Sequence, residues 1–310
     1  MLDRDRFHGC LPGLACGDAL GAAVEFRAPG SFEPLLDMAG GGPFRLRAGQ
    51  WTDDTSMALC LAASLAGRGW DPRDQMERYV RWWREGYMSS TGECFDLGNT
   101  VHAALARFER TGEPFSGSSD PCSAGNGSLM RLAPVAMFFA AKPEEAIEKA
   151  GESSRTTHAA ETAVDACRYF AGLLVSALGG VPKQRLLEPL HAPCTGYWER
   201  HGLHPEVAEV ARGSFLRREP PQIVGSGYVV RSLEAALWAF HRGRSFEEAV
   251  LNAANLGDDA DTTAAVCGQI AGAHYGASGI PDHWLGRLHL REEIERLAEQ
   301  LFDLASGAHS

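Results

Sequence analysis

Several features that would place this chain in a familiar class of protein are missing from its sequence. None of the eight cysteines forms a CxxC pair, so the spacing typical of zinc ribbons and thioredoxin-like redox sites is absent. No run of about 18 apolar residues occurs, and we therefore expect no membrane span. The opening MLDRDRFHGCLPG contains acids and an early proline instead of the apolar core of a signal peptide. We expect a reduced, cytoplasmic protein.

Basic residues are scarce relative to acidic ones. The chain has 29 Lys and Arg against 40 Asp and Glu, a formal net charge of -11. Such a surface repels phosphate backbones, which argues against general nucleic-acid binding. Apolar residues make up 45% of the chain, enough for a large buried core. We expect a single domain over residues 1–310, and a monomer.

Patterns typical of β-strands are hard to find, whereas helical periodicity recurs along the chain. Asp71 followed by Pro72 marks one helix start, and Ser245 to Glu248 form a capping box at another. The sequence therefore predicts an all-α fold. We expect helices over residues 5–23, 54–67, 72–86, 98–110, 128–140, 142–150, 158–178, 232–241, 249–256, 262–276 and 291–305, with short helices and loops between residues 181 and 224.

The stretch QWTDDT, residues 50–55, crowds polar side chains at the start of an apolar helical run. One capping oxygen is enough for a helix start, yet four oxygen-bearing residues follow one another from Thr52 to Thr55. The adjacent carboxylates of Asp53 and Asp54 repel each other unless a positive charge lies between them. On this stretch alone, capping and metal binding are about equally supported.

A second acidic cluster, GDDADTT at residues 257–263, also opens an apolar helical pattern. Its DxDT spacing lets Asp259, Asp261 and Thr262 point two carboxylates and a hydroxyl at one place. A polar capping loop explains the same residues, and the EF-hand is a poor match because no calcium-binding loop with a terminal Glu follows. If both clusters converge, their ligands are all oxygens, which favours Mg²⁺, Mn²⁺ or Ca²⁺ over zinc and permits a two-metal centre.

Two more acids lie in or just after the Gly- and Ala-rich helix expected at residues 5–23. Asp18 needs a hydrogen-bond partner if it is buried, so a structural role is the simpler interpretation. For Glu25, the local sequence favours a solvated helix end. Gly17 and Gly21 indicate that another backbone approaches this helix closely.

The segment SAGNGSLMR, residues 123–131, is rich in small residues and opens an apolar helical pattern. Small residues allow positive φ and let backbone N–H groups approach an anion, so a diphosphate cradle fits, as does a plain turn with a cap. A P-loop is excluded because GxxxxGK[ST] is absent. Core packing explains His158 and Tyr228, although His158 would also serve as a helix cap and Tyr228 as a stacking surface for a base.

Taken in order, seven motifs resemble those of the ADP-ribosylglycohydrolases: GDALGAAVEF, QWTDDTSM, CFDLGNT, AGNGSLMRLAP, TTH, GYVVRSLEAALWAF and NLGDDADTTAAVCGQIAGAHYG. The likeness is nearest to the bacterial branch typified by the dinitrogenase reductase-activating glycohydrolase. It implies an orthogonal all-α domain with a dinuclear Mg²⁺ or Mn²⁺ centre in a cleft. It also implies hydrolysis of the glycosidic bond between ADP-ribose and an acceptor.

The resemblance assigns roles residue by residue. Asp96 matches an acid near the scissile ribose, and Glu25 a Glu that closes over the ligand, which reverses the local interpretation of Glu25. The proton acceptor is then Asp96 or a metal-bound acid such as Asp54. The implied ligands of the two ions are Thr52, Asp53, Asp54, Asp259, Asp261 and Thr262. The residues implied at the diphosphate, distal ribose and adenosine are Gly125, Asn126, Gly127, Ser128, His158 and Tyr228.

The chain departs from the family at Asp258, where many relatives have glycine; this adds a negative charge beside the site, and we expect either backbone strain or an altered outer shell there. The favoured partner is a protein ADP-ribosylated on arginine, by analogy with the nearest branch. Serine-linked ADP-ribose, poly(ADP-ribose), O-acetyl-ADP-ribose and modified nucleic acid stay open as substrates. Three rival functions are a non-catalytic ADP-ribose-binding module, a structural protein of the same fold and a metal-dependent phosphohydrolase. Complete ligand sets argue against the first two, and the lack of a His-Asp metal pair against the third.

Overall fold

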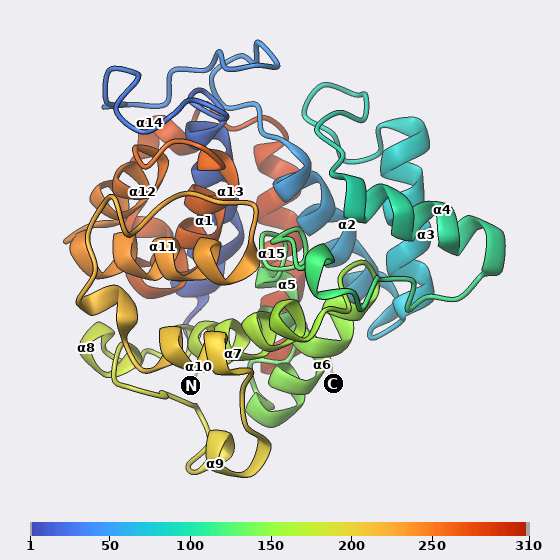
Figure 1. Cartoon of the computed structure of the whole chain (residues 1–310). Coiled ribbons are helices and arrows are strands. Elements are labelled where there is room, and N and C mark those ends of the chain that lie inside the picture. Colours follow the sequence, from blue (N-terminus) through green and yellow to red (C-terminus); the bar gives the residue numbers. More distant parts are fainter. Residues whose placement is uncertain (1, 308–310) are drawn as a thin grey trace.

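The computed structural model describes residues 2–307, and throughout this range its regular structure is helical (Figure 1). Isolated bridges occur there but no strand, which confirms the all-α fold expected from the periodicity. The α-helices are α1 (Arg4–Gly21), α2 (Asp53–Arg68), α3 (Pro72–Glu85), α4 (Asn99–Thr111), α5 (Ala133–Phe138), α6 (Pro143–Arg155), α7 (Glu161–Leu178), α8 (Lys183–Leu186), α9 (Tyr197–His201), α10 (Pro205–Ala211), α11 (Val229–Arg242), α12 (Phe246–Ala254), α13 (Ala260–Tyr275), α14 (Asp282–Leu285) and α15 (Arg291–Ser306). Short 3-10 helices are η1 (Pro121–Ser123), η2 (Ser214–Leu216) and η3 (Ala277–Gly279).

Helices α1 and α13 run antiparallel through the centre of the molecule (Figure 1). A glycine recurs at every fourth position of α1, from Gly9 to Gly21, and faces glycine or alanine of α13. A Cβ at Gly17 would lie 2.1 Å from the carbonyl oxygen of Ala264, and one at Gly272 would lie 2.0 Å from that of Gly9. No side chain fits there without moving a backbone, which confirms the close approach expected for this helix. The stripe sets the end of α1 beside the start of α13.

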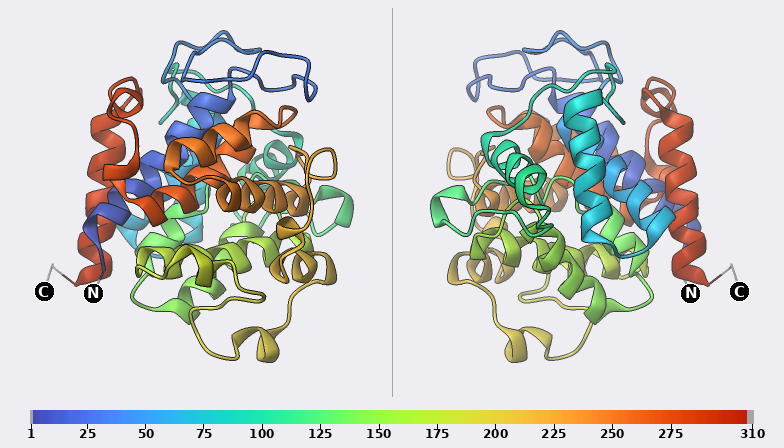
Figure 2. Two further views of the ribbon diagram at one scale, coloured as in Figure 1. Left: turned by 90° about the vertical axis from the view of Figure 1, so that its left-hand side faces the viewer. Right: turned by 90° about the vertical axis from the view of Figure 1, so that its right-hand side faces the viewer.

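The other long helices cover this central pair. Helices α2, α5, α7, α11, α12 and α15 pack around it over a continuous apolar core, with α3 and α4 outside α2. Helix α15 lies along the start of α1 (Figure 2), where the rings of Phe7 and Phe302 meet at 5.2 Å. Within the described range, none of these helices has the length and hydropathy needed to cross a bilayer.

The helix starts that the sequence marked are present. Asp71 accepts a hydrogen bond from the N–H of Arg73 at 3.0 Å, at the start of α3. Ser245 accepts one from the N–H of Glu248 at 3.1 Å, at the start of α12. The Glu248 carboxylate in turn accepts from the N–H of Arg244 at 2.8 Å, so its side chain also bonds to the backbone that precedes the helix, much as in a capping box.

Two helices begin more than one residue later than predicted, and both differences concern the candidate site. Residues 127–131 form turns, and α5 begins only at Ala133. A helix through this point fails because Pro134 has no N–H and its ring would clash with the carbonyl four residues earlier. Helix α7 begins at Glu161, so His158 precedes it and does not cap it.

Candidate active site

The start of α2 is capped by an acid from another helix. Asp18 of α1 accepts hydrogen bonds from the N–H groups of Thr52 and Thr55 at 2.9 and 3.0 Å. It also accepts from their hydroxyls, at 3.0 and 2.6 Å. A carboxylate in this place satisfies orphan donors and complements the helix dipole. The structural role expected for Asp18 is confirmed, and capping no longer explains Asp53 and Asp54.

The two acidic motifs meet where α2 and α13 begin. The hydroxyl of Thr52 lies 3.4 Å from a carboxylate oxygen of Asp54 and 3.3 Å from one of Asp261. The hydroxyl of Thr262 lies 3.3 Å from the same oxygen of Asp54. Side chains that are 209 positions apart in the chain therefore share one site.

Loops after α1 and before α4 add Glu25 and Asp96 to this place. One carboxylate oxygen from each of Glu25, Asp96 and Asp261 lies within 4.8 Å of the other two. The carboxyls of Asp96 and Asp53 also interact, and as two carboxylates they would repel each other unless a proton or a cation lies near them. Glu25 is only 3% exposed, so the solvated helix end favoured by its local sequence is wrong.

A pair of backbone hydrogen bonds joins the loops that carry Glu25 and Asp259. The N–H of Phe26 donates to the carbonyl of Asp258 at 2.7 Å, and the N–H of Asp258 donates to the carbonyl of Arg27 at 2.8 Å. Phe26 and Asp258 both have positive φ, 60° and 52°, which is costly for a residue with a side chain. The strain expected at Asp258 is present, and the two bonds between the loops hold it in place.

Six acids of this site have a raised pKa. Burial raises the pKa of each of them, and neighbouring carboxylates raise the pKa of most of them further. The pKa of Glu25 is raised to about 11 and that of Asp96 to about 7. Buried oxygens of Glu25, Asp54 and Asp261 (Oε2, Oδ1 and Oδ1) have no hydrogen-bond partner among the described residues. We call the group the acidic cluster; its members are Glu25, Asp53, Asp54, Asp96, Asp259 and Asp261.

Divalent cations fit the acidic cluster. Its donors are carboxylate oxygens, with the hydroxyls of Thr52 and Thr262 beside them, which is the ligand chemistry of Mg²⁺, Mn²⁺ or Ca²⁺. Buried carboxylate oxygens without a partner are costly, and a cation supplies the charge that they lack. Such a charge would also lower the raised pKa values, so that the carboxyls ionise together.

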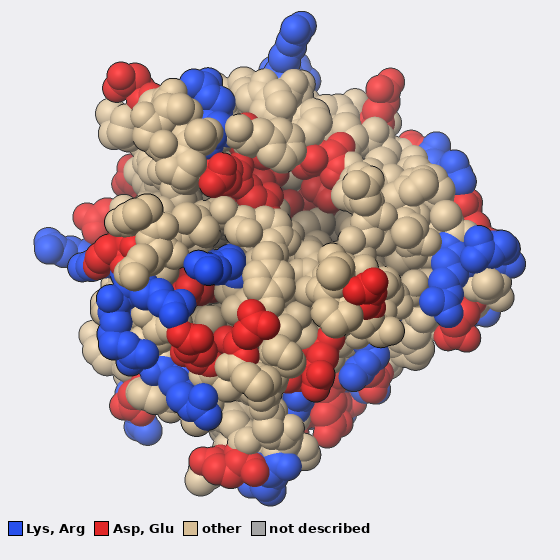
Figure 3. All heavy atoms as spheres, in the orientation of Figure 1, with Lys and Arg blue, Asp and Glu red and all other residues tan. Residues whose placement is uncertain are grey.

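A cleft of about 250 Å³ opens over the acidic cluster. Figure 3 shows acidic atoms gathered around a hollow on this face of the molecule. Asp53, Asp259 and Thr262 reach the cleft, whereas Thr52, Asp54 and Asp261 are not among the residues that line it. Of the residues expected to bind ADP-ribose, the cleft is lined by Gly125, Asn126, Gly127 and His158.

Sequence reasoning assigned no role to residues 98–101 at the start of α4, which line the cleft. Phe26, Met130 and Gly227 also line it. The motif CFDLGNT, which ends at Thr100, was the signal that could have found residues 98–100. Their exposure to the cleft depends on how α4 packs.

Gly125 and Gly127 do not use the conformational freedom that the sequence suggested, because neither has positive φ. A Cβ at Gly125 would lie 3.2 Å from Nε2 of His158, and one at Gly127 would lie 2.9 Å from Cε1 of that ring. The two glycines therefore leave room for the imidazole to reach the cleft. In residues 2–307 the N–H groups of Gly127 and Ser128 have no partner, and Gly127 lines the cleft, where a free N–H suits an anion.

The side chain of Ser128 faces the core, not the cleft. Its hydroxyl donates to Oγ of Ser154 at 2.8 Å, and Ser154 donates to the carbonyl of His158 at 2.8 Å. Ser128 thereby holds the backbone of His158. A contact between the Ser128 hydroxyl and a bound ligand has no support in this arrangement.

Tyr228 lies beside the cleft but does not line it. Its backbone pairs with that of Gly125, and its hydroxyl donates to the carboxylate of Glu206 at 2.9 Å. The bond to Glu206 draws the hydroxyl toward α10. Stacking on adenosine would require a ligand that extends beyond the cleft.

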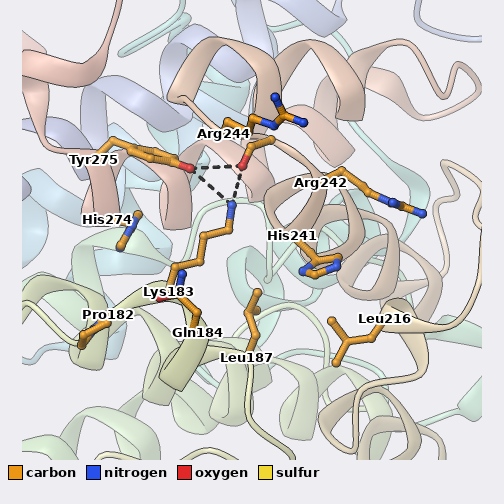
Figure 4. Close-up of a pocket in the computed structure, with 11 residues that line it drawn as sticks. Pro182, Lys183, Gln184, Leu187, Leu216, His241, Arg242, Arg244, His274 and Tyr275 are labelled. Carbon is orange, nitrogen blue, oxygen red and sulfur yellow. Dashed lines mark hydrogen bonds between the residues drawn. The ribbon is translucent and has the colours of Figure 1, made fainter.

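A larger cavity of about 700 Å³ lies at the other end of α13 (Figure 4). The ammonium of Lys183 donates to the carbonyl of Gly243, just after α11, and lies 3.3 Å from the hydroxyl of Tyr275. Arg242 pairs with Glu219, and burial lowers the pKa of His274 to about 4, which leaves it neutral near pH 7. Because these basic groups have partners or carry no charge, the larger cavity is not the better candidate for chemistry.

Comparisons with known proteins place the chain in a family. The ADP-ribosylglycohydrolase family model matches residues 1–310. The ADP-ribosylarginine hydrolase Tri1 of Pseudomonas putida (strain GB-1) is 44% identical over 302 residues, which cover 97% of this chain and 79% of that protein. The ADP-ribosyl-[dinitrogen reductase] glycohydrolase of Rhodospirillum rubrum is 31% identical over 308 residues, and 97% of each chain is covered.

A solved structure has the same fold. It is described as an ADP-ribosylglycohydrolase-related protein complex and matches with a TM-score of 0.86 at 47% identity, over 97% of this chain and 98% of the other. The likeness therefore extends over almost all of the helices described above. On these matches, the chain belongs to the ADP-ribosylglycohydrolase family.

Proposed function

We propose that this chain is a metal-dependent hydrolase that cleaves the glycosidic bond between ADP-ribose and arginine side chains of proteins. The observation that carries the proposal is the acidic cluster at the floor of the cleft. Three of its buried oxygens lack a partner, and no Lys or Arg in the described part of the chain forms an ion pair with it. A relative named ADP-ribosylarginine hydrolase, 44% identical to this chain, supports arginine as the acceptor.

Two divalent ions, Mg²⁺ or Mn²⁺, would be held by Thr52, Asp53, Asp54, Asp259, Asp261 and Thr262. When bound, they would supply positive charge to the ribose oxygens and lower the pKa of water toward neutrality. The side chains are already held for this task. Asn126 donates to the carboxylate of Asp259 at 2.6 Å, and Asp18 fixes the start of α2.

Asp96 is the residue we assign to proton transfer. It lines the cleft, and its carboxyl interacts with that of Asp53. In the ionised form that a nearby cation favours, this carboxylate would accept a proton from the attacking water and return it to the leaving group. Asp96 is also held at φ 57°, a conformation that persists only where the surroundings enforce it. Glu25 closes the cleft beside it.

Binding of the diphosphate is assigned to the part of the cleft lined by Gly127 and His158. The free N–H groups of Gly127 and Ser128 and the ring of His158 would donate to phosphate or ribose oxygens. Fixed donors of this kind hold the glycosidic bond over the acidic cluster, and such orientation supplies much of the rate.

The test is release of ADP-ribose from a protein ADP-ribosylated on arginine, compared with a peptide ADP-ribosylated on serine. We expect release from the arginine adduct with Mg²⁺ or Mn²⁺ and none in EDTA. Release in EDTA contradicts the metal assignment, and release from serine alone contradicts the acceptor. Tight binding of ADP-ribose without any release would make the chain a binding module. Asp96→Asn should bind ADP-ribose and release none.

A further inference from the structure

Arg131 is a buried guanidinium without a carboxylate partner in the described part of the chain. Its side chain is 0% exposed. Its Nη1 donates to the carbonyl of Gly127 at 2.9 Å, and its Nη2 donates to the hydroxyls of Thr156 and Thr157 at 3.2 and 2.7 Å. The ring of Tyr79 lies 4.6 Å from Cζ. Because arginine stays protonated, burying it without a counter-ion is costly, and such a residue calls for a functional reason.

The direction of the hydrogen bonds around Arg131 can be worked out from its chemistry. Arginine has donors only, so the hydroxyl oxygen of Thr157 accepts from Nη2. The Thr157 oxygen could accept a second bond, but among the described residues Nδ1 of His158, at 2.9 Å, is the one other partner of this hydroxyl, so its hydrogen is bonded only if it points to Nδ1. The Thr156 hydroxyl has hydrogen bonds in the same two directions: it accepts from Arg131 and donates to the carbonyl of Ser153 at 2.7 Å.

This chain of bonds decides where the imidazole carries its proton. With Nδ1 accepting from Thr157, the proton of a neutral ring lies on Nε2. Burial and the charge of Arg131 lower the pKa of His158 to about 3, so the ring is neutral at physiological pH. Nε2 lies beside Gly125 at the cleft wall. The group facing the ligand is therefore an N–H donor.

We propose that Arg131, acting through the hydroxyl of Thr157, is a positioning residue that holds His158 as the Nε2–H tautomer, so that the ring donates a hydrogen bond to an oxygen of bound ADP-ribose. The identity of the ligand rests on the proposed function. The position of the proton does not, and it can be measured without ligand or turnover.

The first measurement is the ¹⁵N spectrum of the histidine rings, with the His158 signals assigned from their loss in His158→Gln. We expect a single Nε2–H tautomer in the wild-type protein, with no titration between about pH 5.5 and 8. A ring protonated on Nδ1, or a doubly protonated ring near pH 7, would overturn the proposal. Only the assignment uses a variant, His158→Gln; the tautomer itself is read from the wild-type protein.

The second measurement compares variants by the same spectrum and by calorimetry with free ADP-ribose. Thr157→Val, which keeps the shape but loses the hydroxyl, should give mixed tautomers and about tenfold weaker binding, the value of one hydrogen bond. Thr157→Ser should restore the wild-type spectrum and affinity. An unchanged spectrum and affinity in Thr157→Val would also overturn the proposal.

Thr156→Val is the matched control. Thr156 accepts from the same guanidinium but does not contact His158, so this variant should lose stability without changing the ring spectrum or the affinity. If it weakens ADP-ribose binding as much as Thr157→Val does, the role of Arg131 is structural only. If wild-type protein fails to bind ADP-ribose, the proposed function is contradicted, while the ring spectrum still decides the tautomer.

Discussion

The two ends of helix α13 carry polar side chains in opposite states. At its start, the acidic cluster holds buried carboxylates, three of whose oxygens have no partner among the described residues. At its end, Lys183 donates to the carbonyl that follows α11, and Arg6 donates to carbonyls at the ends of α7 and α13. Lys183 and Arg6 are satisfied by carbonyl groups of the protein itself, whereas three buried carboxylate oxygens at the acidic end are not. Unmet charge distinguishes the candidate site here, and cavity size does not.

Helix polarity suits both ends and so does not distinguish them. Acids are favoured at helix starts and bases at helix ends, because the macrodipole is positive at the start and negative at the end. Both ends also depend on one scaffold, the glycine stripe between α1 and α13. The two ends differ in whether each charged group has a hydrogen-bond or ion-pair partner, and only the tertiary structure shows this.

Asp261→Asn should have the largest effect, at the acidic end. Under the proposed function, the amide removes a charge that would help to hold a cation, so we expect ADP-ribose release to fall by at least about a hundredfold. Initial rates with Mg²⁺ or Mn²⁺ measure this, and circular dichroism checks that the fold is kept. Asp165→Asn is the control, because Asp165 is a buried acid paired with Arg168 at 2.6 Å. Wild-type rates in Asp261→Asn would remove the acidic cluster from the chemistry.

The second largest effect should be that of pH on the stability of protein stripped of metal with EDTA. The pKa of Asp96 is about 7 in the folded chain against 3.8 unfolded, so between about pH 4 and 7 the folded chain binds the extra proton. The free energy of unfolding should therefore fall as pH rises, by at least about 1 kcal/mol from this group. Denaturant unfolding at several pH values measures the slope.

Two comparisons sharpen this pH experiment. Asp96→Asn should flatten the slope, because the titrating group is gone. Excess Mg²⁺ should oppose the slope, because a cation favours the ionised carboxylates. Stability in EDTA that rises over this interval would show that the acidic cluster is not held protonated.

Lys183→Met should have the smallest effect and only on stability. Loss of a charged hydrogen bond to the carbonyl of Gly243 should cost about 1–3 kcal/mol, measured by denaturant unfolding. ADP-ribose release should stay at the wild-type rate. Lys142→Met, at an exposed pair with Glu145, should change stability by close to zero. A loss of turnover in Lys183→Met would mean that the two ends of α13 are coupled.

Much of the fold could be predicted because it depends on neighbours in sequence. The caps at Asp71 and Ser245 and the helical periodicity are local, since they involve residues within about four positions. The pairing of Thr52–Asp54 with Asp259–Thr262 also followed from the motifs. The late starts of α5 and α7 were missed. Pro134 was a local signal that could have been read, whereas the position of His158 depends on Ser154, which bonds its backbone.

The sequence by itself determined that acids and threonines crowd two helix starts, because each of these segments consists of consecutive residues. Only the tertiary structure decided what each of them does. Asp18 caps α2, Glu25 is buried, Ser128 faces the core, and His158 reaches the cleft past two glycines. The physical reason is that each of these roles is a contact between distant segments. The close packing of α1 on α13 and the loops tied to its two ends create those contacts.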